Sequence, residues 1–167
     1  MKSVWLGLFY LLLATAYTAA LDDENDPVGD GKIIPIDASS FAFKDADFAL
    51  GTSQVSWYQA ELLCASIKFT LASILTAADI TTVDEWLQKQ SIYPLLTQPI
   101  WTSGSNLAYS PLYSWHGTGD FITLDNFSGK RPSGTKQMCI GLNARNNLWT
   151  AHSCSDKRYF LCQKRVC

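Results

Sequence analysis

The chain has 167 residues and a formal net charge of −2 at pH 7, and 47% of its residues are hydrophobic. This length accommodates one domain, and the small net charge gives no reason to expect a nucleic-acid partner. The charges are unevenly distributed: residues 21–126 hold fourteen acidic and four basic side chains, whereas residues 127–167 hold one acidic and eight basic side chains. In one interpretation the two halves neutralise each other across the folded surface. In the other, the basic half forms a face for an anionic partner.

The first twenty residues have the pattern of a secretory signal peptide. Lys2 precedes an apolar run over residues 4–14, and small residues follow as far as Ala20. The run is too short for a membrane span, so we expect cleavage after Ala20 and a secreted, extracellular protein, with an uncleaved signal anchor as the alternative. Residues 21–32 are acidic and poor in apolar side chains, which predicts a disordered leader. No second hydrophobic span follows, so we expect no membrane partner and assign residues 33–167 to one domain.

Short strands are predicted at several points of this domain. Near its start, β-branched and aromatic residues are interrupted by Pro35 and Ser39-Ser40, which favours short strands at a sheet edge. Near its end, two apolar runs flank Asn143-Ala-Arg-Asn-Asn147, and asparagine tolerates the left-handed backbone of a tight turn, so these runs predict a hairpin. The predicted strands are residues 33–36, 41–50, 100–103, 138–142, 148–151 and 158–163, with a further strand starting at Trp115 and leading into a turn-rich segment up to Gly134.

Two helices are predicted in the first half of the domain. Ser56 precedes Gln59 by three residues, and Thr76 precedes Asp79 by three, which is the spacing of a capping box at a helix start. Apolar side chains at helical spacing follow each box. The predicted helices run from Trp57 to about Ile67 and from residue 77 to about Gln90. The first helix carries Cys64 on its apolar stripe, so a disulfide there would staple the helix to another element.

The cysteines define the covalent framework of the domain. There are five of them: Cys64, Cys139, Cys154, Cys162 and Cys167. An exported chain enters an oxidising compartment, so we expect disulfides and neither a metal site nor a cofactor. Five choices of the unpaired cysteine and three pairings of the other four give 15 arrangements, and the residues alone leave these open.

Spaced motifs over residues 48–163 resemble the C-type lectin-like domain. The motifs are Trp57-Tyr-Gln-Ala60-x3-Cys64, Leu71-Ala-Ser-Ile74, Trp101, Cys139, Trp149, Cys154 and Phe160-Leu-Cys162-Gln. The resemblance implies an α+β fold in which two helices pack on antiparallel strands, with a long irregular loop and two internal disulfides, Cys64 to Cys162 and Cys139 to Cys154. Cys167 would then be free or interchain, and we predict a disulfide-linked dimer through it. Through Trp101-Thr-Ser-Gly104 the chain is most similar to secreted single-domain members from insects, which implies roles in innate immunity, haemolymph or reproductive fluid.

The long loop departs from the family members that bind sugar through calcium. Those members carry Glu-Pro-Asn or Gln-Pro-Asp in the loop and Trp-Asn-Asp before the last-but-one cysteine. The matching positions here are Arg131-Pro132-Ser133 and Trp149-Thr150-Ala151. Calcium requires six to eight oxygen ligands, and a guanidinium at Arg131 would repel it. We therefore expect no metal there, while Pro132, a position that is often cis in the family, could keep the loop shape.

Two functions are compatible with this loop. The first is carbohydrate binding without calcium, with anionic glycans as a candidate class, and the second is a protein-binding subunit of a disulfide-linked dimer in immune or reproductive fluid. The residues expected to bind the ligand are Lys130, Arg131, Ser133, Lys136 and Thr150. Trp115 is either buried or an exposed aromatic platform for a sugar, and Asn126-Phe127-Ser128 is a sequon that predicts a glycoprotein. The two histidines, His116 and His152, stand singly and outside any catalytic motif, so we expect no enzyme.

Overall fold

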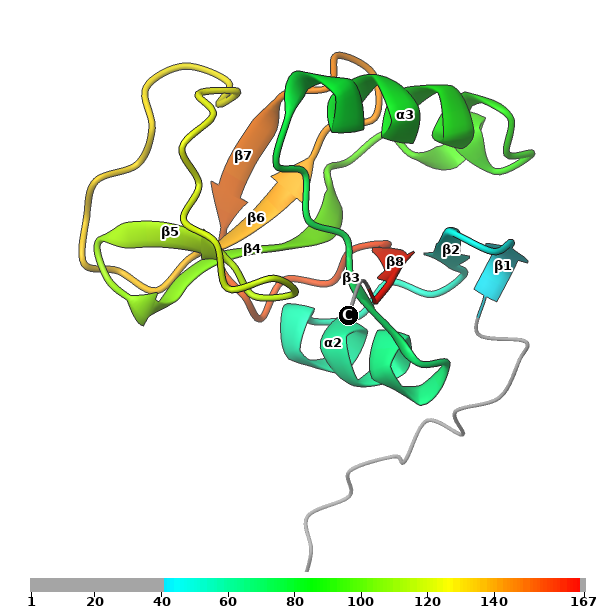
Figure 1. The fold of residues 1–167 in the computed structure, drawn as a ribbon, viewed down its shortest axis with the longest axis horizontal. Coiled ribbons are helices and arrows are strands. Elements are labelled where there is room, and N and C mark those ends of the chain that lie inside the picture. Colours follow the sequence, from blue (N-terminus) through cyan, green and yellow to red (C-terminus); the bar gives the residue numbers. More distant parts are fainter. Residues whose placement is uncertain (1–40, 166–167) are drawn as a thin grey trace, which may run out of the picture. The chain divides into compact units, whose positions relative to one another are not determined.

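The computed structural model describes residues 41–165, which form two helices and eight strands. The helices are α2 (Trp57–Ser66) and α3 (Ala77–Gln88), and a short 3-10 turn, η2, spans Tyr93–Leu95. The strands are β1 (Phe41–Lys44), β2 (Phe48–Gly51), β3 (Phe69–Leu71), β4 (Ile100–Tyr109), β5 (Leu112–Trp115), β6 (Cys139–Leu142), β7 (Trp149–His152) and β8 (Leu161–Lys164) (Figure 1). The predicted signal peptide, the acidic leader, the strand at 33–36 and Cys167 lie outside the described residues.

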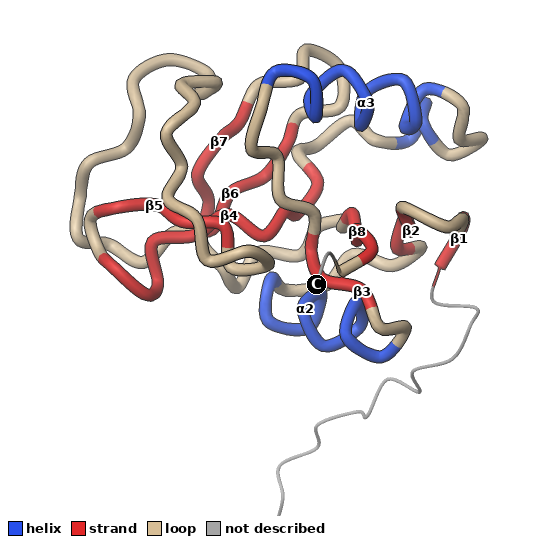
Figure 2. Tube along the Cα trace, in the orientation of Figure 1, coloured by secondary structure: helices blue, strands red, loops and turns tan. Residues whose placement is uncertain are grey.

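The strands form two antiparallel sheets of four. The first has the order β1-β2-β8-β3, so the last strand of the chain lies inside it, with Cys162 opposite both Ala49 and Leu71. The second has the order β5-β4-β6-β7 and contains the predicted hairpin, in which Cys139 faces His152 and Leu142 faces Trp149. Figure 2 shows α2 beside the first sheet, α3 along the opposite side of the described residues, and a long loop joining β5 to β6.

Both helices begin where the capping boxes predict. The Ser56 side chain accepts from the backbone N–H of Gln59, whose own side chain accepts from the backbone N–H of Ser56. Thr76 and Asp79 make the same reciprocal pair at the start of α3. Because each box satisfies backbone donors that a helix start leaves unpaired, these short motifs fix the two start positions.

The two disulfides implied by the resemblance are both present. Cys64 is bonded to Cys162 and thereby joins α2 to β8, and Cys139 is bonded to Cys154 and thereby joins β6 to the turn that follows β7. The bonded residues are 98 and 15 positions apart, so the loop-entropy relation gives about 4.7 and about 3 kcal/mol of stabilisation. The helix-to-strand bridge is therefore the stronger constraint on the unfolded chain.

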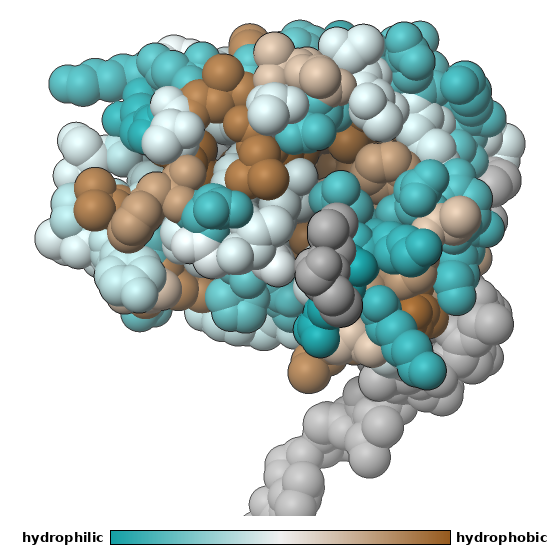
Figure 3. Space-filling view, in the orientation of Figure 1, coloured by the Kyte–Doolittle hydropathy of each residue, from teal (hydrophilic) through white to brown (hydrophobic). Residues whose placement is uncertain are grey.

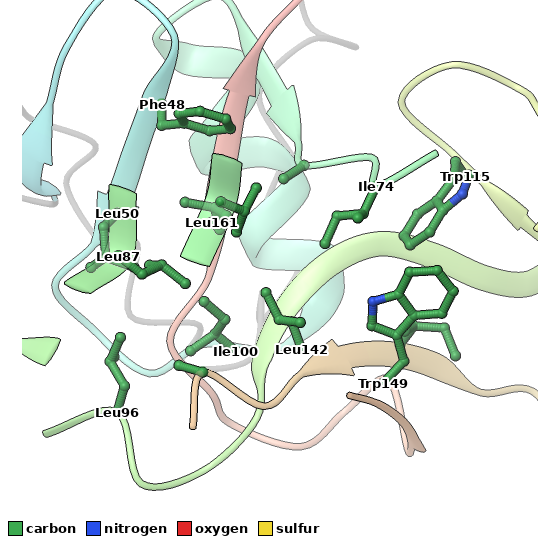
Figure 4. Close-up of a cluster of buried hydrophobic side chains, with 14 of the residues drawn as sticks. Phe48, Leu50, Ile74, Leu87, Leu96, Ile100, Trp115, Leu142, Trp149 and Leu161 are labelled. Carbon is green, nitrogen blue, oxygen red and sulfur yellow. The ribbon is translucent and has the colours of Figure 1, made fainter. Parts of the chain in front are cut away.

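Tryptophan side chains form the centre of the core between the second sheet and the long loop. Trp115 and Trp149 are 1% and 0% exposed, and their rings meet edge to face with centroids 5.2 Å apart. Leu142 and Ile100 pack in the same cluster (Figure 4). Trp57 and Trp101 are buried as well, in a second cluster around the two disulfides. Trp115 is thus a core residue, and the alternative of an exposed sugar platform at this position is wrong.

Two predictions about strands around the β4–β5 hairpin differ from the fold. Trp115 ends β5 instead of starting a strand, because the chain has already turned back at Ser110–Pro111 to pair β5 with β4. The predicted strand at 100–103 accordingly continues to Tyr109. The cis peptide bond among the described residues is Ser110–Pro111, so Pro132 is trans. Within residues 41–165, no helix is long and apolar enough to cross a membrane.

Candidate functional site

The long loop, residues 116–138, is anchored on the second sheet by its middle. Phe127 is buried and contacts the rings of Trp149 and Tyr113, with centroids 5.7 and 5.9 Å away. The backbone N–H of Ser128 donates to Trp149 O, and Trp149 N–H donates to Asn126 O. Residues 126–128 thus pair with the edge of β7, and the Phe127 side chain packs into the core. These contacts hold the loop in one position although it has no regular secondary structure.

Arg131 braces the loop from within. Its Nη1 donates to Ile122 O at 2.7 Å and its Nη2 donates to Leu124 O at 3.0 Å. The guanidinium carbon also lies 5.2 Å from the centroid of the Phe127 ring, which is a cation–π contact. The sequence predicted Arg131 as a ligand contact, and the structure shows that two of its nitrogens are committed to loop carbonyls.

A shallow hollow of about 410 Å³ lies between the long loop and the end of the β4–β5 hairpin. It is lined by Pro111, Leu112, Tyr113, Asp125, Lys130, Arg131, Pro132 and Ser133. The hollow therefore brings together three of the five predicted ligand residues, Lys130, Arg131 and Ser133. Lys130 and Ser133 are exposed, so their polar groups are accessible to a ligand.

Lys136 lies near the same hairpin but outside the hollow. Its backbone oxygen accepts from Asn106 Nδ2 at 2.8 Å, and the neighbouring Thr135 O accepts from the Ser110 hydroxyl at 3.2 Å. These two hydrogen bonds hold the end of the long loop against β4 and the turn that follows it. The Lys136 side chain is exposed there. A ligand in the hollow would need to extend past the hairpin end to reach it.

Thr150 lies apart from the hollow in a hydrogen-bonded chain on β7. Arg158 Nη2 lies 2.9 Å from His152 Nδ1, and His152 Nε2 lies 2.7 Å from Thr150 Oγ1. Since a guanidinium only donates, Nδ1 must accept, and the ring proton is on Nε2 facing Thr150. Burial lowers the pKa of His152, and the nearby Arg158 charge lowers it further while Asp156 opposes both. His152 is therefore neutral and cannot take a proton from Thr150.

Two further polar residues have defined places. His116 Nδ1 lies 3.2 Å from Glu61 Oε1, and its ring contacts Trp57 edge to face. Burial raises the pKa of Glu61, although His116 acts in the opposite direction.

Asn126, the predicted glycosylation residue, is half-buried, and its Nδ2 donates to Asn147 O. A glycan on Asn126 stays a prediction, and it would have to share this nitrogen with the hydrogen bond.

The residues around the hollow do not fit calcium. Asp125 supplies the single carboxylate among the lining residues, and Arg131 lines the same hollow. Calcium needs several hard oxygen ligands and is repelled by a fixed cation. Among residues 41–165, no three histidine, cysteine, aspartate or glutamate side chains are grouped to hold a metal ion.

Sequence reasoning missed three exposed apolar side chains beside the hollow. Tyr109, Leu112 and Phe121 are 59%, 58% and 50% exposed, and the Tyr109 and Phe121 rings lie 5.4 Å apart. The Ser110–Pro111 turn between Tyr109 and Leu112 was a usable signal for two of them, because apolar residues flanking a tight turn project at a hairpin end. Phe121 joins them only through tertiary structure.

Comparison with known proteins gives the family. The Lectin C-type domain matches residues 53–164, which is more than half of the chain. The chain belongs to the C-type lectin domain family. A similar relative is C-type lectin mosGCTL-7 of Aedes aegypti, 23% identical over 125 residues that cover 71% of this chain and 83% of the relative. This match supports a lectin-like, non-enzymatic domain.

Solved structures show the same fold at low identity. TC14, a C-type lectin from the tunicate Polyandrocarpa misakiensis, superposes with a TM-score of 0.59 at 17% identity, covering 72% of this chain and 98% of TC14. The herring type II antifreeze protein superposes with a TM-score of 0.58 at 18% identity, covering 78% and 100%. A lectin and an antifreeze protein share the fold, so the ligand of this C-type lectin domain must be argued from its own loop.

The brace at Arg131 predicts how the loop responds to substitution. Arg131→Ala removes two charge-assisted hydrogen bonds, so the free energy of unfolding should fall by about 2 kcal/mol and amides of residues 122–136 should exchange faster with solvent. Arg131→Lys keeps the charge but cannot bond two carbonyls with a planar fork, and should restore only part of the protection. Lys130→Ala, at the exposed neighbouring position, is the control. Equal exchange in Arg131→Ala and the wild type would show that the brace is unimportant.

The neutral His152 predicts a pH dependence of stability. Because its folded pKa lies below the unfolded value of about 6.5, the unfolded chain binds more protons between the two values. Stability from this group is present above about pH 6.5 and is lost as the pH falls toward the folded pKa. His152→Asn retains an acceptor for Arg158 without titrating, so its stability should change less between pH 7 and pH 5 in urea unfolding. A parallel pH profile for both proteins would exclude His152 as the source.

Proposed function

We propose that this C-type lectin domain binds glycans without calcium in the hollow between its long loop and the β4–β5 hairpin. The observation that carries the proposal is the grouping of Lys130, Ser133 and Asp125 around one open hollow whose loop is braced by Arg131. Hydroxyl and carboxylate groups can bond the hydroxyls of a sugar, and the lysine can bond an anionic substituent. The family match supports carbohydrate as the ligand class.

Anionic glycans are the class that the exposed lysines favour. Lys130 lines the hollow, and Lys136 lies outside it beside Asn106 of β4, where a ligand that extends out of the hollow could bind it. Charges at such exposed positions act over a Debye length of about 8 Å at physiological ionic strength. Asp125 reduces this attraction locally, so the binding should be moderate and sensitive to salt.

The hydrogen bonds of Arg131 support binding without calcium, because they hold the loop without a metal ion. The Arg131 guanidinium supplies a fixed positive charge whose donors satisfy Ile122 O and Leu124 O. A bound metal ion would have to displace this charge and would gain one carboxylate, that of Asp125. Ligand binding in the hollow should therefore not require a metal.

We infer that the protein is extracellular and that Asn126 carries a glycan. The signal-peptide pattern and the two disulfides support export, since disulfides persist in oxidising compartments. A salivary C-type lectin of Aedes albopictus is among the similar proteins. Roles in innate immunity, haemolymph or reproductive fluid are the settings that the insect resemblance supports.

Binding to immobilised heparin, a sulfated polysaccharide, tests the proposal. The wild-type protein should bind, should bind less as salt rises, and should be unaffected by a chelator. Lys130→Glu should weaken binding about tenfold, which corresponds to about 1.4 kcal/mol. Lys89→Glu, at the C-cap of α3, is the matched charge reversal away from the hollow and should bind like the wild type.

Two outcomes would contradict the proposal. Loss of binding in the presence of a chelator would mean that binding requires a metal ion. Calorimetry would then show whether the protein binds calcium. Equal weakening by Lys130→Glu and Lys89→Glu would mean that heparin senses the net charge of the protein and not the hollow. Neutral oligosaccharides measured beside heparin show whether the anionic substituent is needed.

A second candidate function is that of a protein-binding subunit in a disulfide-linked dimer. Both family disulfides are formed, which leaves Cys167 as the remaining cysteine of the chain. Arg165, two residues earlier, lines a hollow of about 460 Å³ with Asp47 and Phe48. In the sequence Cys167 follows Lys164 and Arg165, and flanking positive charge favours the reactive thiolate that exchanges with the disulfide of a partner.

Non-reducing gels of the natively secreted protein test whether Cys167 links two chains. We expect a dimer band that is lost on reduction and in Cys167→Ser, because no other cysteine is available for exchange. The control is Ser155→Cys, which adds an exposed cysteine elsewhere and shows whether any surface thiol dimerises under the same conditions. A monomer band for the wild type contradicts the prediction.

A further inference from the structure

The outer face of the β4–β5 hairpin carries the exposed aromatic pair. Along β5 the side chains alternate: Tyr113 and Trp115 are buried in the core, and Leu112 points to the other face. Tyr109 is the cross-strand partner of Leu112, and Phe121 is bridged to Ser114, so both belong to this outer face. Figure 3 shows hydrophobic colouring at the left, over the end of the hairpin.

These side chains form an exposed apolar patch. Tyr109, Leu112 and Phe121 each expose half or more of their surface, while Ser114 beneath them is only 6% exposed. The two rings are tilted by 58° with centroids 5.4 Å apart, so they hold each other in place. Contiguous exposed apolar side chains with fixed geometry mark interaction sites on soluble proteins.

The patch and the hollow meet at the end of one hairpin. Leu112 belongs to the outer face and also lines the hollow, whereas Tyr113 lines the hollow from the inner face. The two surfaces are therefore separated by the thickness of a single strand. A ligand that contacts both must pass around the hairpin end, so it has to be longer than one or two sugar rings.

We propose that Tyr109 and Phe121 form a second sugar subsite, and that the ligand is an oligosaccharide that continues from the hollow around the hairpin end. The inference rests on the proposed glycan binding in the hollow and specifies the length of the ligand. The C–H groups of a pyranose ring carry partial positive charge and are attracted to the negative face of an aromatic ring. The exposed tyrosine and phenylalanine offer such faces.

The acidic residues nearby favour a glycan over a lipid surface as the occupant. Asp120 precedes Phe121 and is exposed, and Asp125 lines the hollow. A membrane presents its anionic headgroups as a continuous surface, so it would bring negative charge against both carboxylates at once. A sulfated oligosaccharide carries hydroxyls as well as sulfates, so it can donate hydroxyls to the carboxylates while its anionic groups bind Lys130 and Lys136.

Sulfated heparin oligosaccharides of increasing length, from disaccharide to decasaccharide, test the inference by calorimetry. Wild-type affinity should rise with length and then level off once the second subsite is filled. The double variant Tyr109→Ser with Phe121→Ser should bind the disaccharide like the wild type but bind the decasaccharide about tenfold more weakly. Leu62→Ser, which removes a side chain 66% exposed on α2, is the matched control and should keep the full length dependence.

Each outcome separates the second subsite from the hollow. Unchanged decasaccharide affinity in the double variant, with near-ultraviolet circular dichroism showing an intact fold, would overturn the second subsite, while weakening by Lys130→Glu would leave the hollow as the glycan site. Absence of binding at every length in the wild type would overturn both. Sedimentation with vesicles of phosphatidylcholine and phosphatidylserine that depends on Tyr109 and Phe121, without an effect on oligosaccharides, would assign the patch to lipid and overturn the inference.

Discussion

The position of β8 in the middle of the first sheet is the constraint on which the rest of the fold depends. This strand pairs with β2 and β3 at once, and Cys162 on it is bonded to Cys64 of α2. The segment before it also accepts from the second sheet, since Trp101 N–H donates to Tyr159 O. The ends of the domain, one helix and both sheets are therefore fixed by one terminal strand. The long loop takes no part in these contacts, so its sequence is free to serve a ligand.

Side-chain contacts hold the long loop in place. Phe127 inserts into the Tyr113 and Trp149 cluster, and Arg131 bonds two carbonyls of the same loop. A covalently attached guanidinium is present at every calcium concentration. Binding in the hollow would therefore be permanently available, whereas a site that needs calcium is lost when the ion is removed.

The sequence predicts the parts of this structure that rest on local rules or on spaced family motifs. The capping boxes at Ser56 and Thr76 fix the helix starts, and the family spacing selects the two disulfides that cysteine counting leaves open. Contacts between distant segments could not be predicted in the same way. The hydrogen bonds from Arg131 to the carbonyls of residues 122 and 124 depend on how the loop folds back on itself, and the Tyr109–Phe121 pair exists only because β4, β5 and the loop lie side by side.

The basic side chains of the second half of the chain have different environments in the fold. Half of the eight basic side chains after residue 126 donate to separate protein groups: Arg131, Arg145, Lys157 and Arg158. Lys130 and Lys136 are the exposed ones near the hollow. In the proposed site, attraction of an anionic ligand would act most strongly through these two lysines, because salt screens charges that lie farther away. Recognition there would depend on the shape of the hollow and the aromatic pair beside it, with charge selecting among ligands that already fit.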